Sequence, residues 1–161
     1  MRWVCLFVLL AAVPIIAMPV SGAVTLTINA SPDVAPIGDL VTLSGTVNGT
    51  PTIAVYLFLT GPDLDPRGVS LDNLNIPAGR GMFTTAPVHM SDGRWTYAWD
   101  TSVTLGTLRP GRYTVFVTNS PVDRSRFIQA EYATAEIEFL PPRNPVPETP
   151  LDPLLPIGSP W

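Results

Sequence analysis

The sequence has few of the residues that most often carry catalysis or redox chemistry. Its 161 residues include a single cysteine, Cys5, and a single histidine, His89, and every basic residue is arginine, so lysine is absent. Cys5 lies in an N-terminal apolar run that we expect to be removed, which leaves no disulfide and no cysteine metal site. No nucleophile elbow, phosphate loop or zinc-binding helix motif accompanies His89. We therefore expect a protein that is not an enzyme and needs neither a cofactor nor a metal.

Charged residues are also scarce, at 14% of the chain, and the formal net charge is −4. No basic patch is present that could meet phosphates, so nucleic acid is not an expected partner. Hydrophobic residues amount to 46%. The segment 24–140 has the length of one ordinary domain with its own core.

The N-terminus has the order of a secretory signal. A basic start at Arg2 precedes an uncharged apolar run over Trp3–Val20, and the small residues Ser21–Ala23 follow. We expect cleavage after Ala23, which makes 1–23 a signal peptide and directs the protein to the cell exterior, cell surface or cell envelope. The apolar run is also close to the shortest length that crosses a bilayer. An uncleaved membrane anchor is therefore the alternative, and the membrane is an expected partner only in that case.

The C-terminal segment Pro141–Trp161 holds eight of the 19 prolines. We expect it to be extended, polyproline-like and disordered, and to act as a spacer rather than to pack a core. No part of it is apolar over the length of a membrane span. The chain therefore divides into a signal peptide at 1–23, a domain at 24–140 and a proline-rich tail at 141–161.

Short stretches of alternating apolar and polar residues dominate the domain, and only a short turn of helix is expected, at Asp123–Tyr132. Ser91-Asp92-Gly93 has the composition of a hairpin turn. About seven short strands with Pro and Gly turns predict an all-β fold, an immunoglobulin-like antiparallel β-sandwich. The predicted strands are Val24–Ala30, Asp39–Val47, Ile53–Thr60, Phe83–Met90, Arg94–Asp100, Arg112–Thr118 and Thr134–Leu140.

The segment Leu108–Tyr113 has leucine, proline, glycine and tyrosine at the spacing of a tyrosine corner. In that motif the tyrosine hydroxyl bonds to upstream backbone where the chain turns into a late strand. Tyr113 is therefore the predicted structural corner residue. The alternative is an ordinary Pro-Gly turn before a strand.

Trp95, Tyr97 and Trp99 share one face of a predicted strand. Aromatic residues with a period of two most often belong to a core, and we expect these three to do so. The alternative is an exposed platform for sugar rings, which would make the domain a carbohydrate-binding module.

The long connection 61–81 contains Asp63, Asp65 and Asp72, which offer oxygen ligands suited to calcium. Their spacing matches no known calcium loop. Solvated acidic side chains are therefore the simpler explanation, and no metal site is predicted.

Glu136 and Glu138 are two positions apart in a predicted strand, so they share one face, while Ile137 and Phe139 face the opposite way. A carboxylate pair can hydrolyse glycosides at a suitable separation. Neighbouring charges on a solvent face are the simpler explanation, and no catalytic residue is predicted.

Two N-glycosylation sequons occur, at Asn29-Ala30-Ser31 and Asn48-Gly49-Thr50. Each lies at the end of a predicted strand, where the side chain can reach solvent. In an exported protein Asn29 and Asn48 are therefore the expected sites of glycan attachment.

Several segments resemble parts of the S-layer-type surface glycoproteins of methanogenic archaea, and the likeness extends over about 24–142. The resemblance implies an export signal, immunoglobulin-like modules, N-glycosylation and no known enzymatic activity. Such proteins often continue into a membrane-anchoring helix after a proline-rich spacer, whereas none follows the spacer here, so the mode of anchoring stays open. The segments are Tyr56–Leu74, Gly93–Ser102, Pro110–Val117 and Pro121–Phe139.

We therefore expect a non-catalytic, exported cell-envelope module that is a structural or accessory component of an archaeal surface layer. Its expected partners are other envelope or surface-layer proteins, together with glycans. The alternative is a carbohydrate-binding or adhesion module that uses the face of Trp95, Tyr97 and Trp99. Burial of these three side chains distinguishes the two hypotheses.

Overall fold

The computed structural model describes residues 24–49, 51–79 and 82–143. The expected signal peptide at 1–23 and most of the expected tail at 141–161 lie outside the described residues. Within the described part, no helix is long and apolar enough to cross a membrane. The elements are β1 (Thr25–Leu26), β2 (Asn29–Ser31), β3 (Val34–Pro36), β4 (Leu40–Asn48), β5 (Ala54–Thr60), β6 (Thr84–Pro87), β7 (Arg94–Asp100), β8 (Gly111–Thr118), the 3-10 helix η1 (Arg124–Gln129) and β9 (Tyr132–Leu140).

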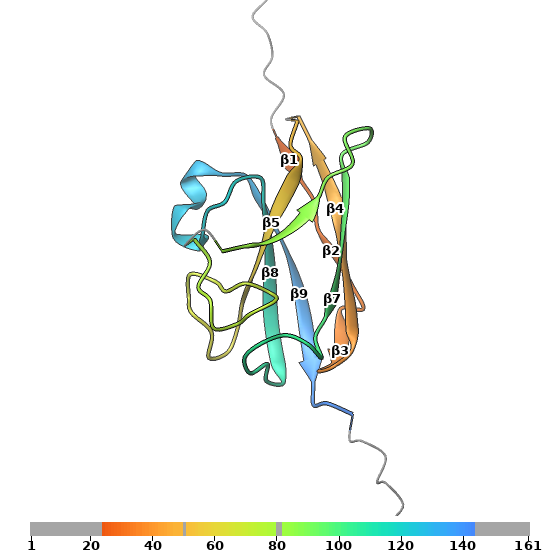
Figure 1. Ribbon diagram of the computed structural model, residues 1–161, viewed down its shortest axis with the longest axis vertical. Helices are drawn as coiled ribbons and strands as arrows, with labels where there is room; N and C mark the ends of the chain where they lie inside the picture. Colours follow the sequence, from red (N-terminus) through yellow and green to blue (C-terminus); the bar gives the residue numbers. More distant parts are fainter. Residues whose placement is uncertain (1–23, 50, 80–81, 144–161) are drawn as a thin grey trace, which may run out of the picture.

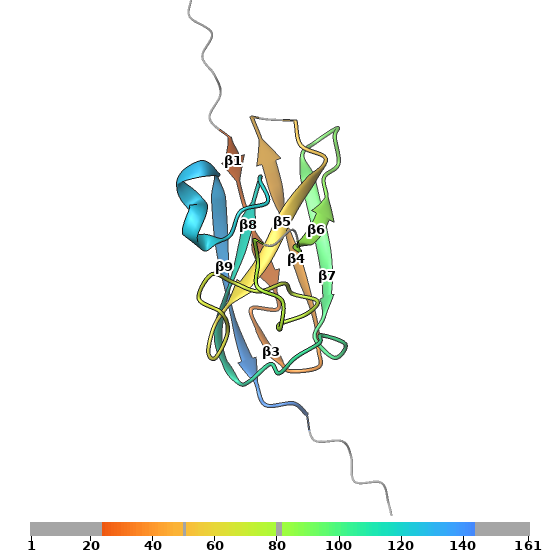
Figure 2. The same cartoon turned by 60° about the vertical axis from the view of Figure 1, so that its left-hand side comes forward.

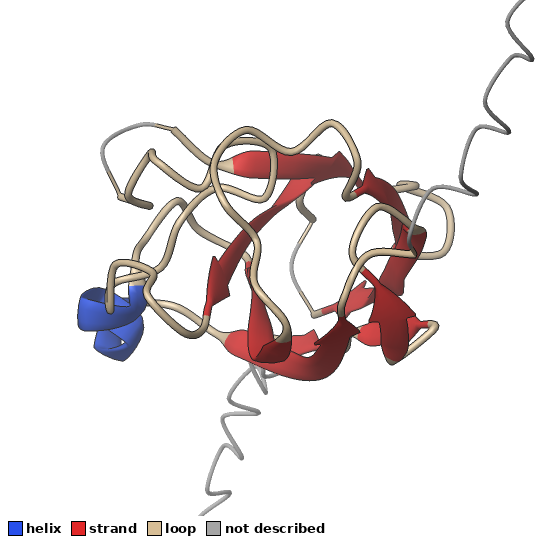
Figure 3. Ribbon diagram, turned by 90° about the horizontal axis from the view of Figure 1, so that it is seen from below, coloured by secondary structure: helices blue, strands red, loops and turns tan. Residues whose placement is uncertain are grey.

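These strands form two sheets (Figure 1). In the first sheet β4 pairs with β1, β2 and β7, and in the second the order is β3-β9-β8-β5-β6. All of these pairs are antiparallel except that of β3 with β9, which is parallel. Seen along the long axis, the strands of both sheets surround one interior, and η1 lies outside it (Figure 3). The prediction of an all-β fold is therefore confirmed.

The main core lies between the two sheets and follows the alternation of the sequence. In β9, Ile137 and Phe139 are buried, whereas Glu136 and Glu138 are exposed. The first sheet contributes large side chains from β4 and β7, and the second contributes the inner faces of β5, β8 and β9. Burial of this apolar surface is the main stabilising contribution to such a fold.

The central strands β5 and β8 are apolar on both faces because both faces are covered. Their inner side chains join the main core. On the outer face, the rings of Phe58 and Phe116 stack with centroids 5.0 Å apart, and Phe127 of η1 packs against both. This outer cluster explains why the segment that forms β5 is almost continuously apolar rather than alternating.

The predicted strand Val24–Ala30 is interrupted between β1 and β2, although both parts pair with β4 in one register. The interruption lies opposite Gly45, where a side chain is excluded. A Cβ at this position would stand 1.9 Å from the Thr27 carbonyl oxygen and 2.9 Å from the Trp95 ring. Glycine in the middle of β4 therefore permits the close approach of the neighbouring backbone.

The turn predicted at Ser91-Asp92-Gly93 is present, but the two strands beside it are not a simple hairpin. The Gly93 amide donates to the His89 carbonyl at 2.8 Å and closes the turn. Beyond one isolated bridge between Val88 and Trp95, β6 pairs with β5 and β7 pairs with β4. The prediction of a hairpin is therefore wrong beyond the tip, because the two strands enter different sheets.

Candidate functional sites

The structure separates the aromatic stripe of β7 into two buried residues and one residue at the surface. Trp95 and Trp99 are each only 1% exposed, and the Trp99 ring meets Phe139 edge to face at 5.5 Å. Tyr97 is half-buried and packs against the edge of the core. A sugar platform needs exposed ring faces, so the alternative that Trp95 and Trp99 form one is wrong.

The hydroxyl of Tyr97 donates to the carboxylate of Asp72, which lies in the long connection between β5 and β6. The same carboxylate accepts a hydrogen bond from the Thr84 hydroxyl at 2.7 Å. Burial, followed by the hydrogen bond to Asp72, raises the pKa of the Tyr97 phenol well above its ordinary value. Tyr97 therefore fastens the long connection to β7.

The two tryptophans of β7 differ in how their indole N–H groups are satisfied. The Trp99 indole N–H donates to the Leu71 carbonyl at 3.1 Å and to the Thr104 hydroxyl at 2.9 Å. The Trp95 indole N–H is buried without a protein partner among the described residues. Trp95 and Trp99 are thus equally buried but differ in whether the indole N–H is hydrogen-bonded.

The three carboxylates of the connection 61–81 are held by three different partners. Asp63 pairs with Arg109 at 2.9 Å, and Asp65 binds the guanidinium of Arg67 through both oxygens, at 3.0 and 2.8 Å. Asp72 accepts from Tyr97, as above. The residues that the structure describes contain no group of three acidic, histidine or cysteine side chains able to hold a metal ion, so the structure does not bring the suggested calcium ligands together.

The long connection is packed rather than loose. Val69 forms isolated bridges with Leu59 and Pro77, and Asn73 forms one with Leu105. Leu71, in the same connection, is completely buried in the main core. The interpretation of this connection from its acidic residues alone thus overlooked the apolar residues Val69 and Leu71, which are buried and anchor it.

Tyr113 stands at the beginning of β8 and bonds to the backbone four residues upstream. Its hydroxyl donates to the Arg109 carbonyl at 2.9 Å and accepts from the Arg109 amide at 3.1 Å. The ring is buried and lies against Gly61, where a Cβ would come within 2.2 Å of the ring. This geometry is that of a tyrosine corner.

Both sequon asparagines are exposed on the first sheet. Asn29 pairs with Ser44 in the ladder between β2 and β4, and Asn48 closes β4 opposite Thr25. Thr50, the third residue of the second sequon, lies outside the described residues. Both amides are thus positioned where a glycan could extend into solvent.

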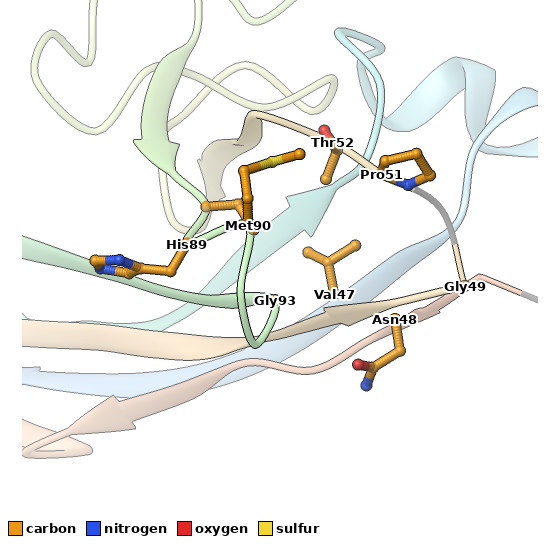
Figure 4. Close-up of a pocket in the computed structure, with 9 residues that line it drawn as sticks. Val47, Asn48, Gly49, Pro51, Thr52, His89, Met90 and Gly93 are labelled. Carbon is orange, nitrogen blue, oxygen red and sulfur yellow. The ribbon is translucent and has the colours of Figure 1, made fainter.

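A depression of about 320 Å³ lies beside Asn48, between the end of β4 and the turn before β7. Figure 4 shows Met90 and Thr52 extending over Val47, while Asn48 points away from them on the other side of the strand. His89 lines the rim and is exposed. Among the described residues, no carboxylate lines this depression, so His89 has no acidic partner there in this part of the chain.

Glu136 and Glu138 line a second, smaller depression with Asp33 and Arg112 on the outer face of β9 and β8. Arg112 lies 3.9 Å from Glu138. Both glutamates are exposed, and pairs of this kind contribute little to stability. Glu136 and Glu138 thus lie next to each other on a solvent-exposed face, with the guanidinium group of Arg112 close to Glu138.

A partly exposed aromatic pair, formed by Phe127 of η1 and Tyr132 at the start of β9, was not predicted from the sequence. Phe127 and Tyr132 stack with ring centroids 4.1 Å apart, and the neighbouring Ile128 is fully exposed. The sequence indicates this pair only by placing two aromatic residues within the expected helical turn, 123–132. These residues contribute apolar surface at the outer side of the second sheet.

No family model and no curated protein matches the chain. Among solved structures, a similar chain is that of an engineered protein whose crystal structure was determined at 1.98 Å resolution. The two have 15% identical residues and a TM-score of 0.39, and the match covers 74% of this chain and 21% of the engineered protein. The chain thus spans about a fifth of the length of that protein.

Proposed function

We propose that this protein is a non-catalytic, exported module of a cell envelope, whose folded domain is an immunoglobulin-like β-sandwich. Two features support the fold assignment: the early strand β3 runs parallel to the last strand β9, and Tyr113 makes a corner bond at the start of β8. In this scheme β4 and β7 belong to one sheet, and β5, β8 and β9 belong to the other.

One observation supports the functional proposal: the acidic side chains of the long connection are paired within the domain, whereas the sequon asparagines are exposed. Asp63, Asp65 and Asp72 are each engaged by a donor of the same chain. Exposed Asn29 and Asn48 are free to carry glycans. Together with the signal-like N-terminus, this distribution supports a structural or accessory role in a surface layer, as the resemblance to archaeal surface glycoproteins implied.

The competing hypothesis of carbohydrate binding loses its main support because Trp95 and Trp99 are core residues. Tyr97 alone does not make a platform, since its hydroxyl is bound to Asp72. The partners we propose are therefore other envelope proteins, with glycans carried on the domain rather than bound by it.

Two measurements on the natural producer test this proposal. An antibody raised against the domain should label intact cells as strongly as permeabilised cells, and labelling only after permeabilisation would refute export to the surface. Intact-mass measurement should show a glycan mass that falls stepwise in Asn29→Gln and Asn48→Gln variants. A mass equal to the bare polypeptide beginning at Val24 would contradict glycosylation while leaving export intact.

A further inference from the structure

Three apolar side chains on the outer side of the second sheet form a surface that we call the aromatic patch. It consists of Phe127 and Ile128 of η1 and Tyr132 of β9. Ile128 is completely exposed and Tyr132 is 49% exposed, and the Tyr132 ring stacks on Phe127 with centroids 4.1 Å apart. The three side chains line a depression of about 480 Å³. The patch thus offers ring surface and a hollow beside it to a partner.

Arginine side chains accompany the aromatic patch. Arg124 and Arg126 belong to η1, and both are exposed. The guanidinium carbon of Arg124 lies 5.8 Å from the centroid of the Phe116 ring, which contacts Phe127 in the same cluster. Among the described residues that line the depression, Glu131 is the one carboxylate. Positive charge beside exposed rings favours a partner that is apolar and acidic.

The proline-rich tail, which lies outside the described residues from position 144 onward, has this composition. Four of its prolines recur at every third position, and because polyproline II has three residues per turn, they would share one edge of such a helix. Leu151, Leu154 and Ile157 have the same spacing and would share a second edge. The charged residues of the tail beyond position 143 are Glu148 and Asp152, both acidic. The four prolines are Pro147, Pro150, Pro153 and Pro156.

The aromatic patch and the start of the tail lie at opposite ends of the domain. η1 is near the upper end in Figures 1 and 2, and β9 finishes at the lower end, where Arg143 pairs with Asp39 at 2.9 Å. To reach the patch of its own domain, the acidic tail would have to reverse and pass the depression beside β9, which is lined by three carboxylates and one arginine. The 18 residues beyond Arg143 span about 55 Å as polyproline II. The tail is therefore long enough to reach a neighbouring copy without this reversal.

We propose that the aromatic patch binds the proline-rich tail of a second copy of this chain, so that copies join head to tail. Exposed aromatic rings bind polyproline segments well, because such segments are already extended and lose little conformational entropy. The acidic side chains of the tail meet Arg124 and Arg126. Since the patch and the tail are different surfaces, the contact is heterologous and allows further copies to add. The contact depends on these two surfaces whether or not the chain is exported, so it goes beyond the function proposed above.

Sedimentation of the chain that begins at Val24, the product of the expected cleavage, tests the self-association. The average mass of the parent should rise with protein concentration. A patch variant with Ile128→Ser and Tyr132→Thr, and a tail variant with Pro150→Ser and Pro153→Ser, should each associate at least about tenfold more weakly, because each loses two anchoring side chains. A parent that stays monomeric at every concentration, as it would with the tail on its own patch, would overturn the proposal.

Two control variants remove the same kinds of residue from other places. Pro142→Ser with Pro145→Ser removes two prolines that lie outside the three-residue repeat. Leu40→Thr with Val103→Ser removes two apolar side chains that are 56% and 71% exposed, near the end of β7 that lies far from η1. Both controls should associate as the parent does, and equal urea midpoints verify that the folds are intact. An equal loss of association in the controls would refute a specific contact.

Mixing the patch variant with the tail variant tests whether the contact joins two copies. The patch variant keeps an intact tail and the tail variant keeps an intact patch. The mixture should therefore form a one-to-one complex at concentrations where each variant alone is monomeric, and absence of this complex would overturn the proposal. Association lost in the patch variant but kept in the tail variant would instead show that patch pairs with patch. If the patch variant does not fold, the comparison of the parent with the tail variant still decides.

Discussion

The two faces of the second sheet are both apolar, but they are buried by different means. The inner face meets the first sheet, and its side chains belong to a continuous core that includes Trp99 and Tyr113. The outer face carries a small cluster around Phe58 and Phe116, covered by η1 and the long connection. Burial between two sheets is enforced by the whole fold, whereas burial under a connection depends on a few local contacts. The inner residues should therefore contribute more to the stability of the whole domain.

The largest expected effect comes from emptying an inner aromatic site. Trp99→Ala should lower the free energy of unfolding by about 3–5 kcal/mol, because it leaves a large cavity in the core. Phe127→Ala, in the partly exposed outer cluster, should cost about 1–2 kcal/mol, since less surface is removed from burial. Urea denaturation of the two variants provides the comparison. Equal losses would mean that the outer cluster is as integral to the fold as the inner core.

A second comparison separates the two buried tryptophans of β7, in the first sheet. Trp99→Phe loses hydrogen bonds to Leu71 and Thr104, whereas Trp95→Phe loses an indole N–H that has no partner among the described residues. Trp99→Phe should therefore be the more destabilising by about 1–2 kcal/mol. Calorimetry or urea denaturation measures the difference, and a larger loss for Trp95→Phe would show that ring volume outweighs hydrogen bonding here.

A single hydroxyl group gives a smaller contrast between the two faces. Tyr113→Phe should lower the free energy of unfolding by about 1 kcal/mol, because the buried hydroxyl both donates to and accepts from Arg109. Tyr132→Phe, on an exposed side chain, is the matched control and should leave stability nearly unchanged. The urea midpoint decides between them. An unchanged midpoint for Tyr113→Phe would mean that the corner bond contributes nothing net.

The smallest expected effect is a dependence on alkaline pH. Burial and Asp72 raise the pKa of folded Tyr97 above that of an unfolded tyrosine, so the protonated phenol is favoured by folding. Its contribution to stability is complete below the unfolded pKa of about 10 and declines as pH rises toward the folded pKa. Because the chain has no lysine, no lysine side chain contributes to the pH dependence in this range.

Urea midpoints at about pH 9 and about pH 11 should therefore differ more in the parent chain than in Tyr97→Phe. Tyr132→Phe serves as the control for the removal of one hydroxyl group from an exposed tyrosine. An identical decline in the parent and in Tyr97→Phe would show that the bond to Asp72 does not couple to folding.

The strands that the sequence predicted best are those with one face in the core and one in solvent. Arg94–Asp100 matches β7 in full, and the predicted strand Thr134–Leu140 lies within β9. In both, the alternation is a local property that each side chain expresses independently of its pairing partner. The short β3 was missed because three residues that include a proline are too few to show an alternation of apolar and polar side chains. Its partner β9 is also separated from it in sequence by most of the domain.

The candidate sites could be predicted only where the residues that interact lie close together in the sequence. The corner at Tyr113 follows a short motif whose turn and strand are adjacent in sequence. By contrast, nothing near Asp72 in the sequence indicates that its carboxylate binds Tyr97, a residue on another strand. The burial of Trp95 and Trp99 was the favoured prediction, yet the exposed alternative had the same period of two.

The sequence by itself determined the class of fold, the approximate positions of most strands and the face that each strand turns toward the core. These properties follow from side-chain alternation and turn composition, which act over a few residues. Tertiary structure alone decided which strands pair, that β6 and β7 enter different sheets, and that β3 runs parallel to β9. Pairing depends on contacts between residues far apart in the chain, and many arrangements of the same strands would satisfy the local pattern equally well.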